Sequence, residues 1–186
     1  MLIDRTYFVG DLNIPNTSTA AIGSLLDWFI EKYEEKFLLD ALGYSLYKAF
    51  KAGMQDDPVA QKWTDLIEGV EYTDLSGITR YWRGLISSVS GDITIEISPI
   101  ACYVYYWFMR NNHSQTATMG EVKSKNENAV SHNPALKMVR AWNEMSQAIR
   151  DLKHFLDAKQ SDYPEWKDHD SWRMLRLFAP INEFNI

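Results

Sequence analysis

The sequence contains a single cysteine, Cys102, and therefore no intrachain disulfide. Because disulfides are typical of secreted domains, we expect a reducing compartment. The N-terminus also lacks a basic segment followed by a long apolar stretch, so we expect no secretory signal. The longest apolar stretch, residues 97–109, contains Pro99 and is too short to cross a bilayer. These absences predict a protein without a membrane anchor.

An excess of basic residues is missing as well. Lys and Arg number 19 against 25 Asp and Glu, which gives a formal net charge of -6. Since affinity for DNA phosphates comes mostly from clustered Lys and Arg, tight wrapping of a duplex is disfavoured. The sequence shows no Gly-rich phosphate loop, nucleophile elbow or paired-cysteine motif. We therefore expect a protein that is not an enzyme and holds no cofactor.

Histidine is scarce, and the four histidines are scattered without the i, i+4 spacing of helical zinc ligands. Residues 168–170, Asp-His-Asp, include metal-ligand types, but three adjacent residues do not converge on one ion without partners elsewhere. We interpret them as a solvated turn or helix cap. Cys102 has apolar neighbours and no basic residue to lower its pKa, so we interpret it as a small buried hydrophobic residue.

Charges of both signs alternate in the first predicted helix, at Glu31, Glu34 and Glu35 and at Lys32 and Lys36. Pairing at the i, i+4 spacing accounts for this pattern without any acid or base chemistry. The pattern predicts a solvated helix face.

Hydrophobic residues are abundant at 46% of the sequence, and aromatic residues reach 13%. A chain of 186 residues with this composition closes a core of its own, so we expect one domain over residues 1–186. The aromatic content exceeds what a core of this size requires. Because Tyr and Trp favour buried interfaces, some of them are expected at a contact with a partner.

Apolar residues recur at three- and four-residue steps in most of the chain, which predicts helices. The predicted helices span residues 18–35, 37–53, 58–69, 99–112 and 134–158. Gly43 predicts a hinge, and Pro58 and Pro134 follow N-cap residues at predicted helix starts. Alternation around Gly77 predicts a hairpin over residues 70–85. The fold class is therefore mainly α, a bundle of about five helices with one small β-hairpin.

Three further segments complete the predicted domain. Residues 1–16 form an extended N-terminal arm or edge strand, residues 113–132 a long polar loop, and residues 159–186 an aromatic-rich C-terminal docking tail. A long loop within a compact domain is commonly mobile or functional.

The segment Arg80, Tyr81, Trp82, Arg83 combines basic and aromatic residues. Such a combination stacks single-stranded nucleic acid in some proteins. Alternation in a strand offers a second interpretation, in which Tyr81 or Trp82 packs on the core and both arginines are solvated. We favour the second interpretation.

These segments together resemble a known protein family. The resemblance lies in the segments FLLDALGYSLYKAF at residues 37–50, PVAQKWTDLIEG, the hairpin end YWRGL, PIACYVYYWFMRNN, GEVKSKNENA, NPALKMVRAWNEM and INEFNI. They resemble a family from tailed phages and prophages that is similar to head-tail connector (adaptor) proteins. The resemblance covers most of the chain, and its motifs are packing patterns, so it implies no catalytic residue. The hairpin at residues 70–85 departs from simple adaptor bundles.

The resemblance implies a structural virion protein that assembles in the bacterial cytoplasm as a homo-oligomeric ring. Its implied partners are the portal and tail-completion proteins, with DNA only passing through the lumen and no membrane contact. An acidic ring does not grip passing DNA, since like charges repel. We expect contacts from residues 1–12, 113–132 and 179–186. The candidate interaction residues are Tyr7, Phe8, Arg80, Trp82, Arg83, Met119, Glu121, Lys123, Asn126, Asn182, Phe184 and Ile186.

Two alternatives from other classes stay open. A ligand-binding module would be monomeric and would contain a well-formed apolar pocket. A single-stranded nucleic-acid accessory protein would expose residues 80–83 and lose affinity steeply with salt.

Overall fold

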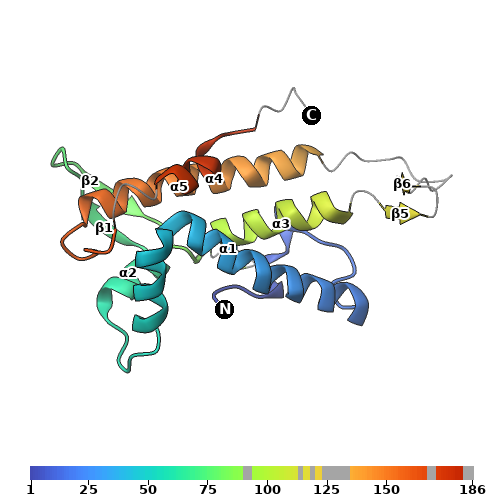
Figure 1. Ribbon diagram of the computed structural model, residues 1–186, viewed down its shortest axis with the longest axis horizontal. Helices are drawn as coiled ribbons and strands as arrows, with labels where there is room; N and C mark the ends of the chain where they lie inside the picture. The colour runs from blue at the N-terminus through green and yellow to red at the C-terminus, as the bar shows by residue number, and fades with distance from the viewer. Residues whose placement is uncertain (90–93, 113–114, 118–119, 123–134, 167–170, 182–186) are drawn as a thin grey trace.

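The computed structural model of the protein describes residues 1–89, 94–112, 115–117, 120–122, 135–166 and 171–181. In these ranges five α-helices make up most of the fold, and the strands form short antiparallel hairpins (Figure 1). The helices are α1 (Ala20–Gly53), α2 (Gln61–Glu68), α3 (Pro99–Asn112), α4 (Ala135–Ala158) and α5 (Ser171–Phe178). The prediction of a mainly helical protein is confirmed.

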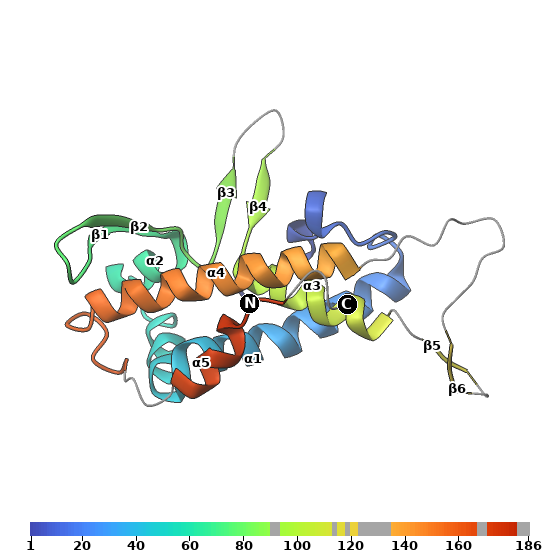
Figure 2. The same ribbon diagram turned by 90° about the horizontal axis from the view of Figure 1, so that it is seen from above.

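Helix α3 is the centre of the molecule. Every residue from Pro99 to Tyr105 is buried, and so is Phe108, which explains why the sequence of this helix is apolar almost all round. Helix α1 lies on one side of α3 and α4 on the other (Figures 1 and 2). Helix α5 packs against both α1 and α4, with Met174 and Leu177 buried. This last helix lies in the segment predicted as a tail and was not predicted.

Helix α1 is bent at Gly43, where the backbone has φ 72° and ψ 161°. This conformation is essentially restricted to glycine because a Cβ atom clashes there. The apolar face of the helix continues on both sides of the bend, with Phe37 and Leu42 before it and Leu46 and Phe50 after it, all buried. The predicted hinge at Gly43 is confirmed, but the predicted division between residues 35 and 37 is wrong, because α1 continues through these positions.

The other helix boundaries test the capping signals. Helix α4 begins at Ala135 and ends at Ala158, close to its predicted range. Helix α2 ends at Gly69, as predicted, with φ 92°. Its predicted start at Pro58 is wrong, because the chain is still extended at Ala60, with φ -64° and ψ 139°, and the helix begins at Gln61.

The N-terminal arm is not a strand. It forms two 3-10 turns, η1 (Arg5–Tyr7) and η2 (Gly10–Leu12). These turns pack against the helices α1, α3 and α4 and against the strand β4 (Ile95–Ile97). The side chains of Ile3 and Ile14 are buried in the common core. The arm is thus part of the body of the domain.

Glu34 on α1 holds the beginning of this arm. Its carboxylate is buried and accepts hydrogen bonds from the backbone N–H groups of Leu2, at 2.9 Å, and Ile3, at 3.2 Å. The predicted solvated helix face is therefore wrong at Glu34. Its partners lie far away in the sequence, so the i, i+4 charge pattern gave no sign of them.

Short strands form three hairpins in the described ranges. Strands β1 (Val70–Thr73) and β2 (Thr79–Trp82) form the predicted hairpin, with Val70 opposite Trp82. Strands β3 (Ser87–Val89) and β4 (Ile95–Ile97) form a second, unpredicted hairpin. Strands β5 (Gln115–Ala117) and β6 (Gly120–Val122) pair within the predicted loop. The fold thus has more strand than predicted, because three-residue strands are too short to show alternation.

Candidate interaction surfaces

The segment at residues 80–83 divides between core and solvent. The indole of Trp82 is 1% exposed, stacks on the ring of Phe155 with centroids 5.9 Å apart, and donates a hydrogen bond from Nε1 to the Leu66 carbonyl oxygen at 3.0 Å. Tyr81 is 61% exposed, and Arg83 is exposed. The expectation that Trp82 contacts a partner is corrected, since its indole fills the chain's own core. The strand interpretation accounts for this alternation.

Arg80 is exposed and forms an ion pair with Asp74 in the turn of the same hairpin. Asp74 also accepts hydrogen bonds from the backbone N–H groups of Ser76 and Ile78, at 2.8 and 2.9 Å. The Arg80 guanidinium, followed by these N–H groups, lowers the pKa of the Asp74 carboxyl. Arg80 is thus engaged in shaping the hairpin turn.

Tyr7 and Phe8 are also buried in the core of the chain. Both side chains belong to the chain's own hydrophobic core, so the expectation that Tyr7 and Phe8 act mainly as partner contacts is corrected. The remaining candidates Met119, Lys123, Asn126, Asn182, Phe184 and Ile186 lie outside the described residues, as does the segment 168–170. The backbone of Glu121 pairs with Thr116 between β5 and β6.

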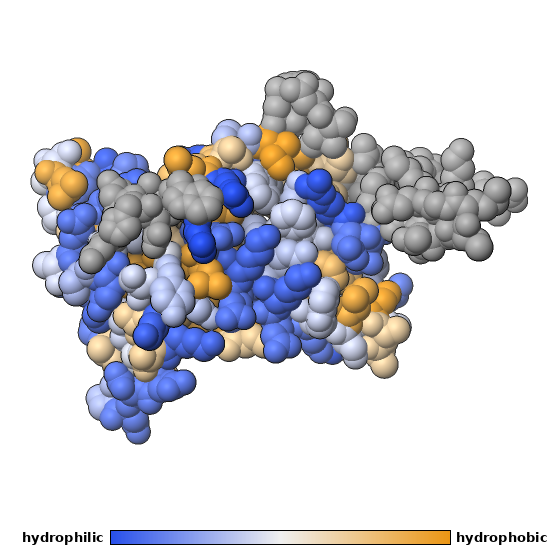
Figure 3. Space-filling view, viewed as in Figure 1, coloured by the Kyte–Doolittle hydropathy of each residue, from blue (hydrophilic) through white to orange (hydrophobic). Residues whose placement is uncertain are grey.

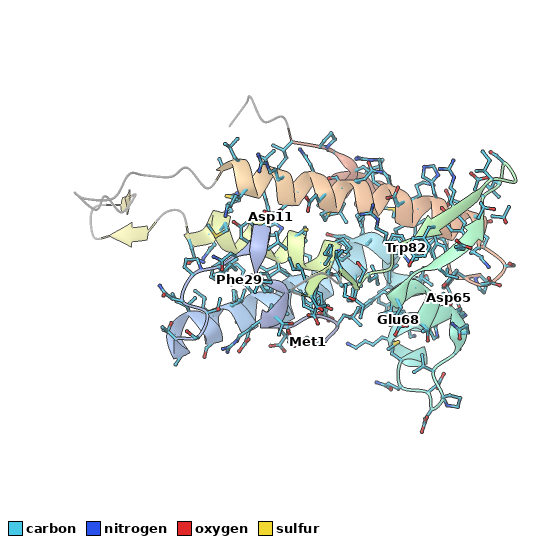
Figure 4. All side chains as sticks on the ribbon, turned by 180° about the vertical axis from the view of Figure 1, so that it is seen from behind. Met1, Asp11, Phe29, Asp65, Glu68 and Trp82 are labelled. Carbon is cyan, nitrogen blue, oxygen red and sulfur yellow. The ribbon has the colours of Figure 1, made fainter. Side chains whose placement is uncertain are left out.

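A groove of about 450 Å³ opens beside η1, between α2, β2 and the β3–β4 hairpin. We call it the acidic groove, and it is lined by Tyr7, Glu68, Tyr81, Ile86, Ser87, Ser88 and Glu96. Figure 4 shows this side of the molecule, with Glu68 on α2 near Trp82. No lining residue is basic, so the groove presents uncompensated carboxylates to a partner.

The electrostatics of the groove follow from its carboxylates. Glu96 accepts a hydrogen bond from the Thr6 hydroxyl at 2.6 Å, and Glu68 is exposed without an ion pair among the described residues. Burial raises the pKa of Tyr7, and the negative charges of Glu96, Asp4 and Glu34 raise it further. The potential around the Tyr7 hydroxyl is therefore negative.

A second surface combines cations with aromatic rings on α1 and α3. We call it the basic aromatic face, and it consists of Trp28, Lys32, Tyr33, Lys36, Trp107 and Arg110. The rings of Tyr33 and Trp107 are stacked, with centroids 5.6 Å apart and an interplanar angle of 11°. Each of these two rings lies beneath cations, so the rings and charges form one continuous surface.

Three cations of the basic aromatic face lie over the rings of Trp28 and Trp107. Lys32 Nζ lies 4.6 Å from the centroid of Trp28, Lys36 Nζ 5.2 Å from that of Trp107, and Arg110 Cζ 5.4 Å from that of Trp107. Cation–π contacts of this kind contribute about 0.5–1 kcal/mol at exposed sites. In the part of the chain that the structure describes, none of the three cations forms an ion pair with a carboxylate.

Sequence reasoning missed this face, because it treated Lys32 and Lys36 as partners of neighbouring glutamates. A usable signal was present in the i, i+4 spacing of Trp28, Lys32 and Lys36, which places one ring and two cations on a single stripe of the helix. The contribution of α3 became visible only with the packing of Trp107 against Tyr33.

A smaller cavity of about 290 Å³ lies between β2, α3 and α4, and Cys102 and Glu144 are among its lining residues. The Sγ atom of Cys102 is 3.9 Å from Oε2 of Glu144. Burial raises the pKa of the Cys102 thiol, and the charge of Glu144 raises it further. The thiol is therefore protonated at neutral pH and is a poor nucleophile. The prediction that Cys102 is buried is confirmed.

The described ranges contain no metal cluster and no membrane-spanning helix. No three His, Cys, Asp or Glu side chains of these residues lie close enough together to hold a metal ion. None of the helices described here has the length and apolar character needed to cross a bilayer.

By fold and surface, the molecule is a mainly helical protein with one acidic groove and one basic aromatic face. Residues 38–173 match the model of a family described as a family of unknown function, DUF6712, and the chain belongs to this family. No curated protein and no solved structure matches the chain.

Proposed function

We propose that the protein is a head-tail connector (adaptor) subunit of a tailed phage, a structural virion protein that oligomerises as a ring between portal and tail. The resemblance described above supports this proposal at the level of the sequence. Under it, residues 1–186 form one connector-like helical domain, assembled in the bacterial host. The net charge of -6 supports a ring through which DNA passes without binding.

The β3–β4 hairpin is the observation that carries the proposal. It projects from the helical body (Figure 2). Its apolar residues are exposed to solvent, with exposed fractions of 57% for Val89, 40% for Ile95 and 40% for Ile97. Its sheet has only two strands in the described ranges. A two-stranded hairpin is marginally stable in water, and its free edges are able to pair with another chain. A projecting hairpin with apolar side chains therefore supports burial against a neighbouring virion protein.

The test is complex formation with the portal protein encoded nearest to this chain. We expect the purified chain to form a stable complex with that portal, detected as a ring-sized mass by light scattering. The variant Val89→Ser, Ile95→Ser, Ile97→Ser should lose the complex, because it removes the apolar contacts of the projecting hairpin. The matched control Leu75→Ser, Ile78→Ser changes exposed apolar residues between β1 and β2 and should still form the complex with the portal. A chain that binds no portal refutes the proposal.

A second candidate function is binding of single-stranded nucleic acid. The basic aromatic face favours it, because stacked rings beneath cations suit bases and phosphates, and Trp28 is 51% exposed. Labelled single-stranded DNA tests this function through fluorescence anisotropy across a range of salt concentrations. Binding that falls steeply with salt and is lost in Lys32→Ala, Lys36→Ala supports it. The same affinity in this variant refutes it.

A further inference from the structure

Two residues of α1 show where the N-terminal arm and the basic aromatic face lie around this helix. Glu34 and Lys36 are two positions apart, so their side chains point about 200° apart around the helix axis. Glu34 binds the N-terminal arm, whereas the Nζ atom of Lys36 lies over Trp107. The arm and the basic aromatic face therefore lie on opposite sides of α1.

The rest of the fold extends this division. Residue Tyr7 of the arm and Glu96 of β4 both line the acidic groove, so the groove is on the side of the arm. Helix α5 lies on the other side, in the foreground of Figure 1, and brings the exposed residues Arg173 and Arg176 there. Figure 3 shows this side, where hydrophilic residues dominate and hydrophobic ones form small separate groups.

Asp40 is a half-buried carboxylate close to the basic aromatic face. Burial raises the pKa of Asp40, while the positive charges of Lys36, Arg173 and Arg176 act in the opposite direction. Asp40 is half-buried, and the cations that act on it are Lys36, Arg173 and Arg176 and not Lys32 or Arg110.

We propose that the acidic groove of one copy of this chain receives the basic aromatic face of the next copy. The groove offers Glu68 and Glu96 to the cations, and the exposed ring of Tyr81 to the exposed indole of Trp28. Burial of Trp and Tyr at the centre of a contact commonly supplies much of the binding energy. This inference rests on the proposed function, because it assigns the contact between neighbouring subunits of the ring.

The arrangement of the two surfaces determines the kind of assembly. A contact between two different surfaces on opposite sides of a subunit is heterologous, so it leads from copy to copy and closes as a ring when the rotation permits. A second copy also accounts for both surfaces at once. Nucleic acid would occupy the basic aromatic face alone, because the carboxylates of the groove repel phosphates.

Charge reversal tests the contact in the full-length chain. The variant Lys32→Glu, Lys36→Glu makes both surfaces acidic, and the variant Glu68→Lys, Glu96→Lys makes both basic. Each variant alone should self-associate at least about tenfold more weakly than the wild type in sedimentation experiments at low ionic strength. An equimolar mixture of the two should regain association, because every acidic surface again meets a basic one. High ionic strength should weaken the wild-type contact.

The variant Lys48→Glu, Lys51→Glu is the matched control, with the same change in net charge elsewhere on α1. It should associate as the wild type does, and circular dichroism confirms the fold of every variant. The contact is refuted if the mixture associates no better than its components, or if the control weakens association equally. It is also refuted if the wild type stays monomeric up to about 1 mM, the concentration range of very weak contacts.

The outcomes separate this contact from the proposed function. A chain that binds the portal but fails the charge-reversal test retains its proposed function and loses only the contact described here. A chain that passes the charge-reversal test but binds no portal has the contact without the proposed function. Loss of single-stranded DNA binding in Lys32→Glu, Lys36→Glu with unchanged self-association assigns the face to nucleic acid and refutes the contact.

Discussion

The buried carboxylate of Glu34 accepts a hydrogen bond from the backbone N–H of Ile3 at 3.2 Å, across 31 positions of the sequence. The same carboxylate accepts the N–H of Leu2 through both of its oxygens. Hydrogen bonds to an ionised acceptor are about twice as strong as neutral ones. Glu34 thus fixes the arm to α1, on the side that forms the acidic groove.

Replacement of Glu34 by alanine should lower the free energy of unfolding by about 2–3 kcal/mol, because two N–H groups of the arm lose their acceptor in a place with little water. Urea unfolding measures this change. Glu31→Ala, at an exposed position of the same helix, is the control and should change stability by less than about 0.5 kcal/mol. Equal stabilities of the two variants would show that Glu34 does not hold the arm.

The bend of α1 provides a second prediction. Gly43→Ala should destabilise the protein by about 1–3 kcal/mol, since a Cβ atom at φ 72° and ψ 161° is strained. Thermal unfolding followed by circular dichroism measures the loss. Ser45→Ala, exposed two positions later, should be nearly neutral or slightly stabilising in a helix. A fully stable Gly43→Ala variant would mean that the bend does not require glycine.

Gly43 and Gly69 show what the sequence predicts well. Their conformations are properties of single residues, so a glycine at the end of an apolar period is a direct sign of a bend or a helix end. Trp82 belongs to the same group, because alternation along a strand places every second side chain on the core. The mainly helical character followed from periodicity alone.

The features that the sequence did not predict depend on contacts between distant segments. Glu34 looks like a solvated residue in its local pattern, and only the docking of Ile3 makes it buried. The basic aromatic face requires Trp107 of α3 to stack on Tyr33 of α1, and neither residue indicates the other. The acidic groove joins Glu68 to Glu96 through tertiary packing. Surfaces of this kind have no signature in one sequence.

Strand β2 allows a test of burial at adjacent positions. Trp82→Ala should lower the free energy of unfolding by about 3–5 kcal/mol, because it removes a buried indole and the contact with Phe155. Tyr81→Ala should change it by less than about 1 kcal/mol, because the ring is largely exposed. Denaturant unfolding measures both. A larger loss in Tyr81→Ala than in Trp82→Ala would reverse the assigned orientation of the strand.

Ionisation of Tyr103 on α3 makes the free energy of unfolding depend on pH in the alkaline range. Burial raises the pKa of Tyr103 to about 12 from its ordinary value of 10.0, and the charges of Asp40 and Tyr33 act in the same direction. An unfolded chain loses this proton near pH 10. Between these two values the folded state therefore holds more protons than the unfolded state, and stability falls as the pH rises. Below about pH 10 the contribution is fully present.

Tyr103→Phe removes this ionisation while keeping the ring. From about pH 9 to pH 12 the wild type should lose about 2–3 kcal/mol more stability than Tyr103→Phe, as measured by urea unfolding at each pH. The exposed Tyr81→Phe is the control and should follow the wild type. Buried Tyr105 and Tyr163, whose pKa values burial also raises, contribute equally to all three proteins and cancel in the comparison. Parallel pH profiles for the wild type and Tyr103→Phe would show that the Tyr103 hydroxyl reaches water, since desolvation is the main cause of its raised pKa.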